Sequence, residues 1–410
     1  MLHGTCTLLT VTMLVGPDPG TGAARARQVA TDSVSGLEVV DVTSGWTRPE
    51  AGLADGLRAD AWPGWMAARW RGTSVEAPGS RSVLLLQDGQ RVVGAFVNQP
   101  GPMRWRSGLL GAMDLDLERV RGIGPLDHPV PSGGTQDRVL LVNGDRVEGF
   151  VEEISMERGV RIRDGGGQES GSWHTLGAVK AIELAERPAD PDQAAGWTVW
   201  LDDGSRVRVD TWRLESDRLV LDGLRLPGAA ASHQVDRTHV VALSSPDSAL
   251  RPLADLRADA AMGPESGRLA PARLIASPGP WPLDLRPLRL CGPGRFAWDL
   301  PAGRWMLRAT LSVPQDVQSM AGCQVRVLDA NEERAVFKIG KDFHPQAIHI
   351  PCGSGSLVVE ILTSDRSPVG GQVELRDALI HPIPDGSVEA NGSRTTVPSA
   401  PAGPDDVDPR

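Results

Sequence analysis

Side chains that could carry out catalysis are scattered along this chain and form no recognisable motif. None of the eight histidines is four residues from another, so no two would share a helix face as metal ligands. No H-E-x-x-H, C-x-x-C, G-x-S-x-G, P-loop or dinucleotide-binding pattern occurs either. Asp114, Asp116 and Glu118 alternate along a predicted strand, where such a row could hold calcium or simply face solvent. The sequence therefore predicts a protein that is not an enzyme and that holds no cofactor or metal.

A run of short alternating strands occupies the C-terminal region, residues 284–384. Trp305, Leu307, Ala309 and Leu311 fall on one face of a period-2 segment, which is the pattern of a half-buried strand. The segment 357–362 is apolar on both faces and is expected to be a central strand. Turn residues separate these runs, and no long helical stripe interrupts them. The spacing predicts an antiparallel β-sandwich.

Several strings in this region resemble a known module. Pro287–Leu300 resembles the opening strand of the NPCBM/NEW2 family, a jelly roll of galactose-binding type, and Pro301–Leu311 resembles its second strand. Gly322–Asp329 is similar to the family's V-x-F-x-V-x-x-D strand, and Ser354–Leu362 and Glu374–Ile380 are similar to its later strands. The resemblance covers only this C-terminal region. It implies a β-sandwich that binds carbohydrate.

The family's expected binding positions are altered here. Cys291 stands where the family has a histidine, and Gln372–Leu375 stand where its closing strand has His-Ala-Asp-Trp. Sugar sites combine an aromatic face with polar groups that fix hydroxyls, so the resemblance implies a retained fold with weakened affinity. Phe343 lies in a predicted loop between two polar residues, whereas core packing is the favoured alternative for Trp298. The candidate carbohydrate-binding residues are Arg295, Trp298, Asp342, Phe343, His344, Asp365 and Arg366.

Three similar segments precede the predicted sandwich. An apolar strand, an Asp-Gly or Asn-Gly pair and an Arg-Val pair recur around Gly89, Gly144 and Gly204. Asp-Gly and Asn-Gly readily adopt the positive φ of a tight hairpin. Each unit of about five short strands resembles an Sm-like or SH3-like small barrel, and the period suits one small domain per repeat. The sequence therefore predicts small barrels over 79–126, 135–185 and 195–245.

Charge argues against the nucleic-acid binding for which many Sm-like barrels are known. The chain carries 42 Lys and Arg against 52 Asp and Glu, a net charge of −10, which disfavours binding to a polyanion. No basic strand rich in aromatic residues is present. The predicted barrels are therefore expected to serve packing or protein contact, with no nucleic-acid partner.

The N-terminal residues 1–26 have features of an export signal. Cys6–Gly16 is an apolar stretch of suitable length, and Ala24–Ala26 offers a small-x-small cleavage site. The apolar stretch is too short to span a bilayer, so no membrane span is expected after cleavage. Cys291, Cys323 and Cys352 would then remain, either with one pair as a disulfide or as buried apolar side chains.

The other segments are assigned by composition. Tryptophans of the segment 27–78 are expected to pack onto the first barrel, with a sugar-stacking platform as the less favoured alternative. The segment 246–283 is expected to be a linker with a helix over Leu250–Met262. The polar residues 385–410 are expected to be a disordered tail.

Two functions are compatible with these observations. The first is an exported, non-catalytic protein of the periplasm or cell exterior that binds glycan or envelope polysaccharide through its C-terminal module. The alternative is a structural or protein-interaction scaffold of the cell envelope with a degenerate sugar site.

Overall fold

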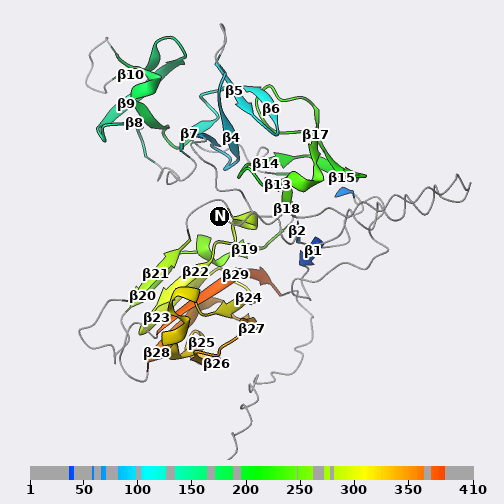
Figure 1. Cartoon of the computed structure of the whole chain (residues 1–410), viewed down its shortest axis with the longest axis vertical. Helices are drawn as coiled ribbons and strands as arrows, with labels where there is room; N and C mark the ends of the chain where they lie inside the picture. The colour runs from blue at the N-terminus through cyan, green and yellow to red at the C-terminus, as the bar shows by residue number, and fades with distance from the viewer. Residues whose placement is uncertain are drawn as a thin grey trace, which may run out of the picture.

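The computed structural model describes residues 37–40, 58–59, 66–70, 82–97, 103–125, 134–163, 171–187, 195–246, 248–261, 272–277, 281–363 and 371–383 (Figure 1). The predicted signal segment, the predicted tail, Asp365 and Arg366 lie outside these residues. Regular structure in the described part is almost entirely antiparallel β-sheet, with a few 3₁₀ turns, which confirms the predicted fold class. None of its helices is long and apolar enough to cross a membrane.

Three consecutive β-meanders occupy the upper part of Figure 1. Repeat 1 contains β3 (Ser82–Leu86), β4 (Arg91–Phe96), β5 (Arg104–Ser107), β6 (Gly111–Asp114) and β7 (Val120–Pro125). Repeat 2 contains β8 (Asp137–Leu141), β9 (Arg146–Ser155), β10 (Gly159–Arg163), β11 (Ser172–His174), η3 (Leu176–Ala178) and β12 (Val179–Glu183). Repeat 3 contains β13 (Trp197–Leu201), β14 (Arg206–Val209), β15 (Thr211–Glu215), β16 (Arg218–Asp222), β17 (Ser232–Asp236), η4 (Arg237–His239) and β18 (Val240–Ser244).

The three repeats share one strand pairing. In each repeat the first strand lies between the second and the last, as in β4–β3–β7, β9–β8–β12 and β14–β13–β18. The resemblance of the repeats to Sm-like or SH3-like barrels stays a prediction from the sequence. Apolar side chains from all three repeats pack into one continuous core, which includes the buried Trp105, Trp197 and Trp212.

The repeats join edge to edge in the order 3–1–2. Strand β14 of repeat 3 pairs with β4 of repeat 1, and β7 of repeat 1 pairs with β12 of repeat 2. Beyond repeat 3 the sheet continues through β2 (Ala67–Trp70) to β1 (Leu37–Val40). Trp70 therefore lies on a strand paired with repeat 3, although its segment was expected to pack on the first barrel. Repeat 2 forms the far end of this row (Figure 1).

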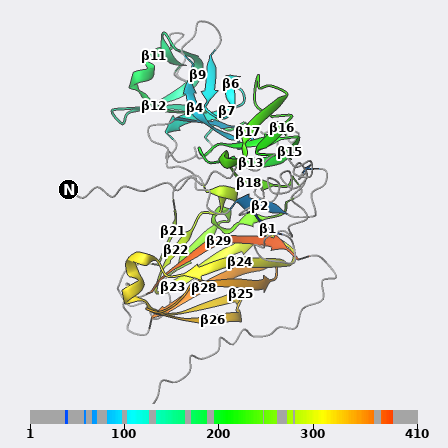
Figure 2. The ribbon, with the colours of Figure 1, turned by 45° about the vertical axis from the view of Figure 1, so that its right-hand side comes forward.

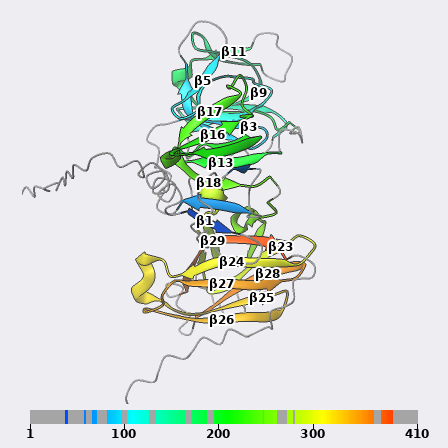
Figure 3. The same cartoon turned by 90° about the vertical axis from the view of Figure 1, so that its right-hand side faces the viewer.

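The C-terminal sandwich has two antiparallel sheets, whose strands occupy the lower part of Figure 3. One sheet contains β19 (Arg251–Pro252), β21 (Arg273–Ala276), β22 (Leu288–Cys291), β24 (Trp305–Ser312), β27 (Gln346–Cys352) and β29 (Gln372–Pro382). The other contains β20 (Ala258–Ala261), β23 (Gly294–Leu300), β25 (Gly322–Asp329), β26 (Glu332–Gly340) and β28 (Gly355–Thr363). Their inward residues form a second core.

The helix predicted over Leu250–Met262 is wrong. This segment forms β19, the one-turn η5 (Leu253–Asp255) and β20. Pro252 cannot donate a helical hydrogen bond, and strand pairing of Ala258 with Trp298 supplies the backbone bonds that a helix would have made. The predicted linker therefore contributes strands to both sheets of the sandwich.

Apolar side chains also fill the contact between repeat 3 and the sandwich. Trp200, Val241 and Met66 from the repeat side pack with Leu283 of η6 (Pro282–Asp284) and Leu379 of β29. Figure 2 shows β2 and β18 lying against the sandwich at this level. Ion pairs flank the cluster: Arg69 contacts Asp377 at 2.7 Å, and Arg206 contacts Asp284.

One smaller expectation is corrected, and one alternative that the sequence left open is decided. Asp114 ends β6, whereas Asp116 and Glu118 lie in the turn that follows, so the three carboxylates do not line one strand face. No cluster of metal-binding side chains occurs in the described ranges. Cys291, Cys323 and Cys352 are all free thiols, and burial raises the pKa of Cys323 and of Cys352 to about 12.

Candidate functional site: a polar pocket on the sandwich

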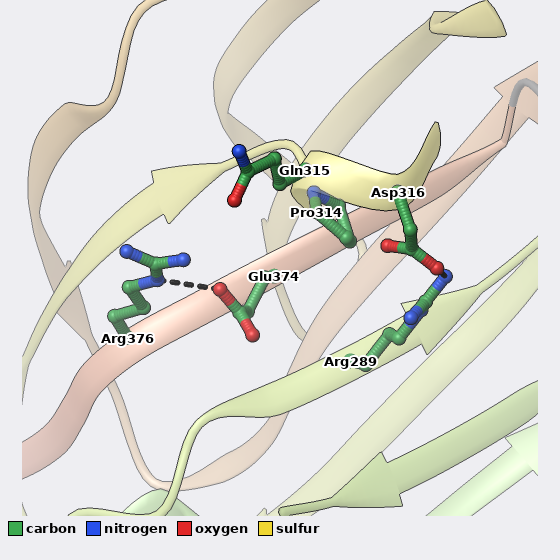
Figure 4. Close-up of a pocket in the computed structure, with 6 residues that line it drawn as sticks. All are labelled: Arg289, Pro314, Gln315, Asp316, Glu374 and Arg376. Carbon is green, nitrogen blue, oxygen red and sulfur yellow. Dashed lines mark hydrogen bonds and ion pairs between the residues drawn. The ribbon is translucent and has the colours of Figure 1, made fainter. Parts of the chain in front are cut away.

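A pocket of about 420 Å³ opens on the outer face of the six-stranded sheet, beside the turn η7 (Gln315–Met320). Figure 4 shows its side chains, which come from β22, β29 and the start of η7. The lining residues are Arg289, Pro314, Gln315, Asp316, Glu374 and Arg376.

Strand alternation places the charged side chains in the pocket. Strands β22 and β29 are antiparallel neighbours, and Arg289 lies directly opposite Glu374. Their neighbours Leu290 and Val373 point the other way and are buried in the core. Because side chains alternate between faces, burying the leucines and valines turns Arg289 and Glu374 outward. Arg376 follows two residues after Glu374, on the same face.

Each cation in the pocket already bonds to an anion. Arg289 donates to an Asp316 carboxylate oxygen at 2.8 Å and to the Gln372 amide oxygen at 2.6 Å. Arg376 donates to Glu374 at 2.5 Å. The hydrogen bond from Arg289 holds the pKa of Asp316 below its ordinary value. The four charges cancel, so the pocket offers alternating donors and acceptors without net charge.

The sequence-predicted site residues do not come together at this pocket. Trp298 is fully buried in the sandwich core, so it presents no ring face to a ligand. Arg295 lies on the other sheet, 3.7 Å from the Glu360 carboxylate. Asp342 and His344 are exposed in the turn between β26 and β27, and Phe343 packs against the core. The backbone carbonyl of Lys341, in the same turn, accepts a long 3.5 Å hydrogen bond from Gln318 of η7.

Trp298 is buried, which agrees with core packing, the alternative that the sequence favoured, and rules it out as a binding residue. It alternates with Phe296 and Leu300 on the inward face of β23, and all three side chains are buried. The apolar alternation of this segment was visible in the sequence, and it is typical of a core face.

The pocket residues were missed, although the sequence held a signal for them. The two segments that depart from the NPCBM/NEW2 pattern, around Cys291 and Gln372, are cross-strand neighbours, and Cys291 lies directly opposite Gln372. Arg289 and Glu374 form the next outward pair on the same two strands. The departures therefore cluster in space beside the pocket, far apart as they are in the chain.

Comparison with known proteins gives little similarity. No protein-family model matches the chain, and no curated protein matches its sequence. Among solved structures, the CBM51 module of Clostridium perfringens GH95, in complex with methyl-galactose, is similar at 13% identity and a TM-score of 0.26, covering 32% of this chain and 99% of that one. The tandem CBM51 modules of Sp3GH98, the family 98 glycoside hydrolase of Streptococcus pneumoniae, give 10% identity and a TM-score of 0.25 over 73% of this chain and 88% of that one. At these scores nothing is carried from those proteins to this chain.

Proposed function

We propose that this chain is an exported, non-catalytic protein that binds a neutral glycan at the pocket between η7, β22 and β29. The observation that supports this most directly is the pair of ion pairs, Arg289 with Asp316 and Arg376 with Glu374, which leaves the pocket without net charge. Sugar hydroxyls both donate and accept hydrogen bonds, so adjacent guanidinium, carboxylate and amide groups suit them. The pocket volume lies within the usual range for small-molecule sites.

The same pairing argues against catalysis at this pocket. A general acid needs a carboxyl group whose pKa is raised toward neutrality. Asp316 accepts from Arg289, and that hydrogen bond lowers its pKa and favours the ionised carboxylate. Asp316 is therefore not suited to give up a proton in a reaction.

A binding experiment on the full chain tests the proposal. A glycan array identifies ligands, and isothermal titration calorimetry then measures affinity, which we expect to be weak because the site is shallow. Replacing Glu374 by Gln removes a charged acceptor, so affinity should fall about tenfold or more. Glu360→Gln is a matched control, since its side chain is 18% exposed against 16% for Glu374 and also pairs with an arginine, on the other sheet. Absence of binding to any glycan at millimolar concentration, or an equal loss in both variants, would contradict the proposal.

A second candidate is a protein-interaction scaffold of the cell envelope. The altered family positions at Cys291 and Gln372 favour it, because neither supplies an aromatic surface. Affinity purification from envelope extract separates the two candidates: protein partners retained in excess free sugar favour the scaffold.

A further inference from the structure

The same β-hairpin occurs three times in the repeats, with the same internal bonds. In each, the turn glycine has positive φ: 84° at Gly89, 93° at Gly144 and 93° at Gly204. Its N–H bonds to the carbonyl three residues earlier, at 3.0, 3.0 and 3.1 Å respectively. An Asp or Asn precedes each glycine, and its side-chain oxygen accepts a hydrogen bond from the N–H of the residue that follows the glycine. The three hairpins are therefore equivalent, position by position.

The hairpins of repeats 1 and 3 bind each other reciprocally. The Arg91 side chain donates to the carbonyl of Gly204 at 3.0 Å, and the Arg206 side chain donates to the carbonyl of Gly89. Arg91 and Arg206 are equivalent residues and face each other in the strand register. The two hairpins are therefore related by an approximate local two-fold axis.

A second pair of bonds follows the same symmetry. The Val93 N–H donates to the Ser205 hydroxyl at 3.0 Å, and the Arg208 N–H donates to the Gln90 side-chain oxygen at 2.7 Å. Val93 is equivalent to Arg208, and Ser205 to Gln90. Both acceptor residues are only 1% exposed. The hairpin is therefore self-complementary when two copies meet edge to edge.

The repeat 2 hairpin has no such partner among the described residues. Asn143, Gly144, Asp145 and Arg146 are all exposed. Strand β9 pairs with β8 over Arg146–Gly149, but β10 reaches β9 only from Phe150 onward, so the edge at 146–148 carries no neighbouring described strand. Open strand edges tend to pair with another chain.

Two exposed apolar residues precede and follow the 143–148 segment in the chain. Val142 is 65% exposed and Phe150 is 48% exposed, and they are two of the four large apolar side chains that are exposed among the described residues. Charge also suits self-association. Asp145 occupies the position of Gln90 and Ser205, so two copies would bring two Asp145 carboxylates beside two Arg146 guanidinium groups.

We propose that a second copy of this chain binds at the 143–148 edge of repeat 2, with the pairing that joins repeats 1 and 3. Arg146 of each copy donates to the Gly144 carbonyl of the other, and the Glu148 N–H donates to Asp145 of the other. The contact is isologous and joins the row of repeats of two chains into one sheet. Because the edge is short, the dimer is weak and concentration-dependent.

Sedimentation velocity of the full chain across a concentration series tests this. The wild type should shift from monomer to dimer as its concentration rises. Arg146→Glu brings four carboxylates together at positions 145 and 146 of the two copies and should weaken the dimer at least about tenfold. Lys180→Glu makes the same change of charge at an exposed position of the same repeat and should leave association unchanged.

A mixture identifies the contact itself. Asp145→Lys should be monomeric like Arg146→Glu, because the contact would then bring together four cations, the new lysine and Arg146 of each copy. Mixed together, the two variants have opposite charges and should form a heterodimer. The proposal is overturned if the wild type stays monomeric at the highest concentration, if Lys180→Glu weakens association as much as Arg146→Glu, or if the mixture stays monomeric.

Discussion

The hairpins of repeats 1 and 3 and the hairpin of repeat 2 share one backbone geometry in opposite surroundings. Gln90 and Ser205 are buried because each lies against the other repeat, whereas Asp145 at the same position is exposed. The turn is therefore determined locally, by Asx and glycine chemistry. Whether a hairpin is covered depends on which edge of its repeat meets a neighbour.

The largest expected effect is a loss of stability at a glycine that repeats 1 and 2 share. A Cβ added to Gly94 would lie 2.2 Å from the Arg106 carbonyl oxygen, and one added to Gly149 would lie 2.2 Å from the Arg163 carbonyl oxygen. These glycines occupy the same position of the second strand, five residues after the turn glycine, so Gly94→Ala and Gly149→Ala should each lower the free energy of unfolding by about 3 kcal/mol. Urea denaturation followed by tryptophan fluorescence measures this.

Gly177→Ala is the control for that pair, because no atom lies within 4 Å of its added Cβ. Its effect should stay within about 0.5 kcal/mol. A small loss of unfolding free energy at both glycines would contradict the close approach, and a large loss at only one of them would show that the two positions are not equivalent.

The next effect, of intermediate size, should distinguish the buried hairpin position at Gln90 from the equivalent exposed position at Asp145. The Gln90 side chain accepts from the Arg208 N–H at 2.7 Å and donates to the Arg225 carbonyl at 3.0 Å. Gln90→Ala leaves both backbone groups without this partner and should cost about 2 kcal/mol of unfolding free energy. Asp145→Ala, the equivalent change on the open edge, should cost less than about 0.5 kcal/mol in dilute protein. Equal losses in a denaturation experiment would mean that the two positions do not differ in environment.

Local pattern predicted far more of this molecule than long-range pairing did. The three hairpins and the sandwich strands were predictable because alternation and Asp-Gly turns act over a few residues. The pocket was not, because Arg289 and Glu374 meet only through the pairing of β22 with β29. The helix over 250–262 failed for the same reason, since Ala258 pairs with Trp298. The edge at Arg146 is open because the repeats pair in the order 3–1–2. That order is set by long-range strand pairing, so no local sequence pattern predicts it.

The smallest expected effect is a change of stability with pH at a position two residues before the turn glycine. Repeats 2 and 3 share a backbone hydrogen bond there but have different side chains. The N–H of Asp202 donates to the His239 carbonyl at 2.9 Å, and Val142 donates likewise to Ala178 at 2.9 Å in repeat 2. Only repeat 3 adds a titratable pair, with 2.8 Å between the His239 ring nitrogen and an Asp202 oxygen. The hydrogen bond with Asp202 raises the pKa of His239 above its ordinary 6.5.

Because the folded-state pKa is the higher one, this pair stabilises the fold fully below about pH 6.5 and loses its effect as pH rises through the folded value. His239 is 43% exposed, so solvent screening limits the change to about 0.5 kcal/mol or less. The difference in unfolding free energy between wild type and Asp202→Asn should shrink as the pH is raised, and NMR titration of the His239 ring should give a lower pKa in the variant. A His239 pKa unchanged by Asp202→Asn would show that the carboxylate has no influence there, which would make this position of repeat 3 as inert as Val142 and Ala178 in repeat 2.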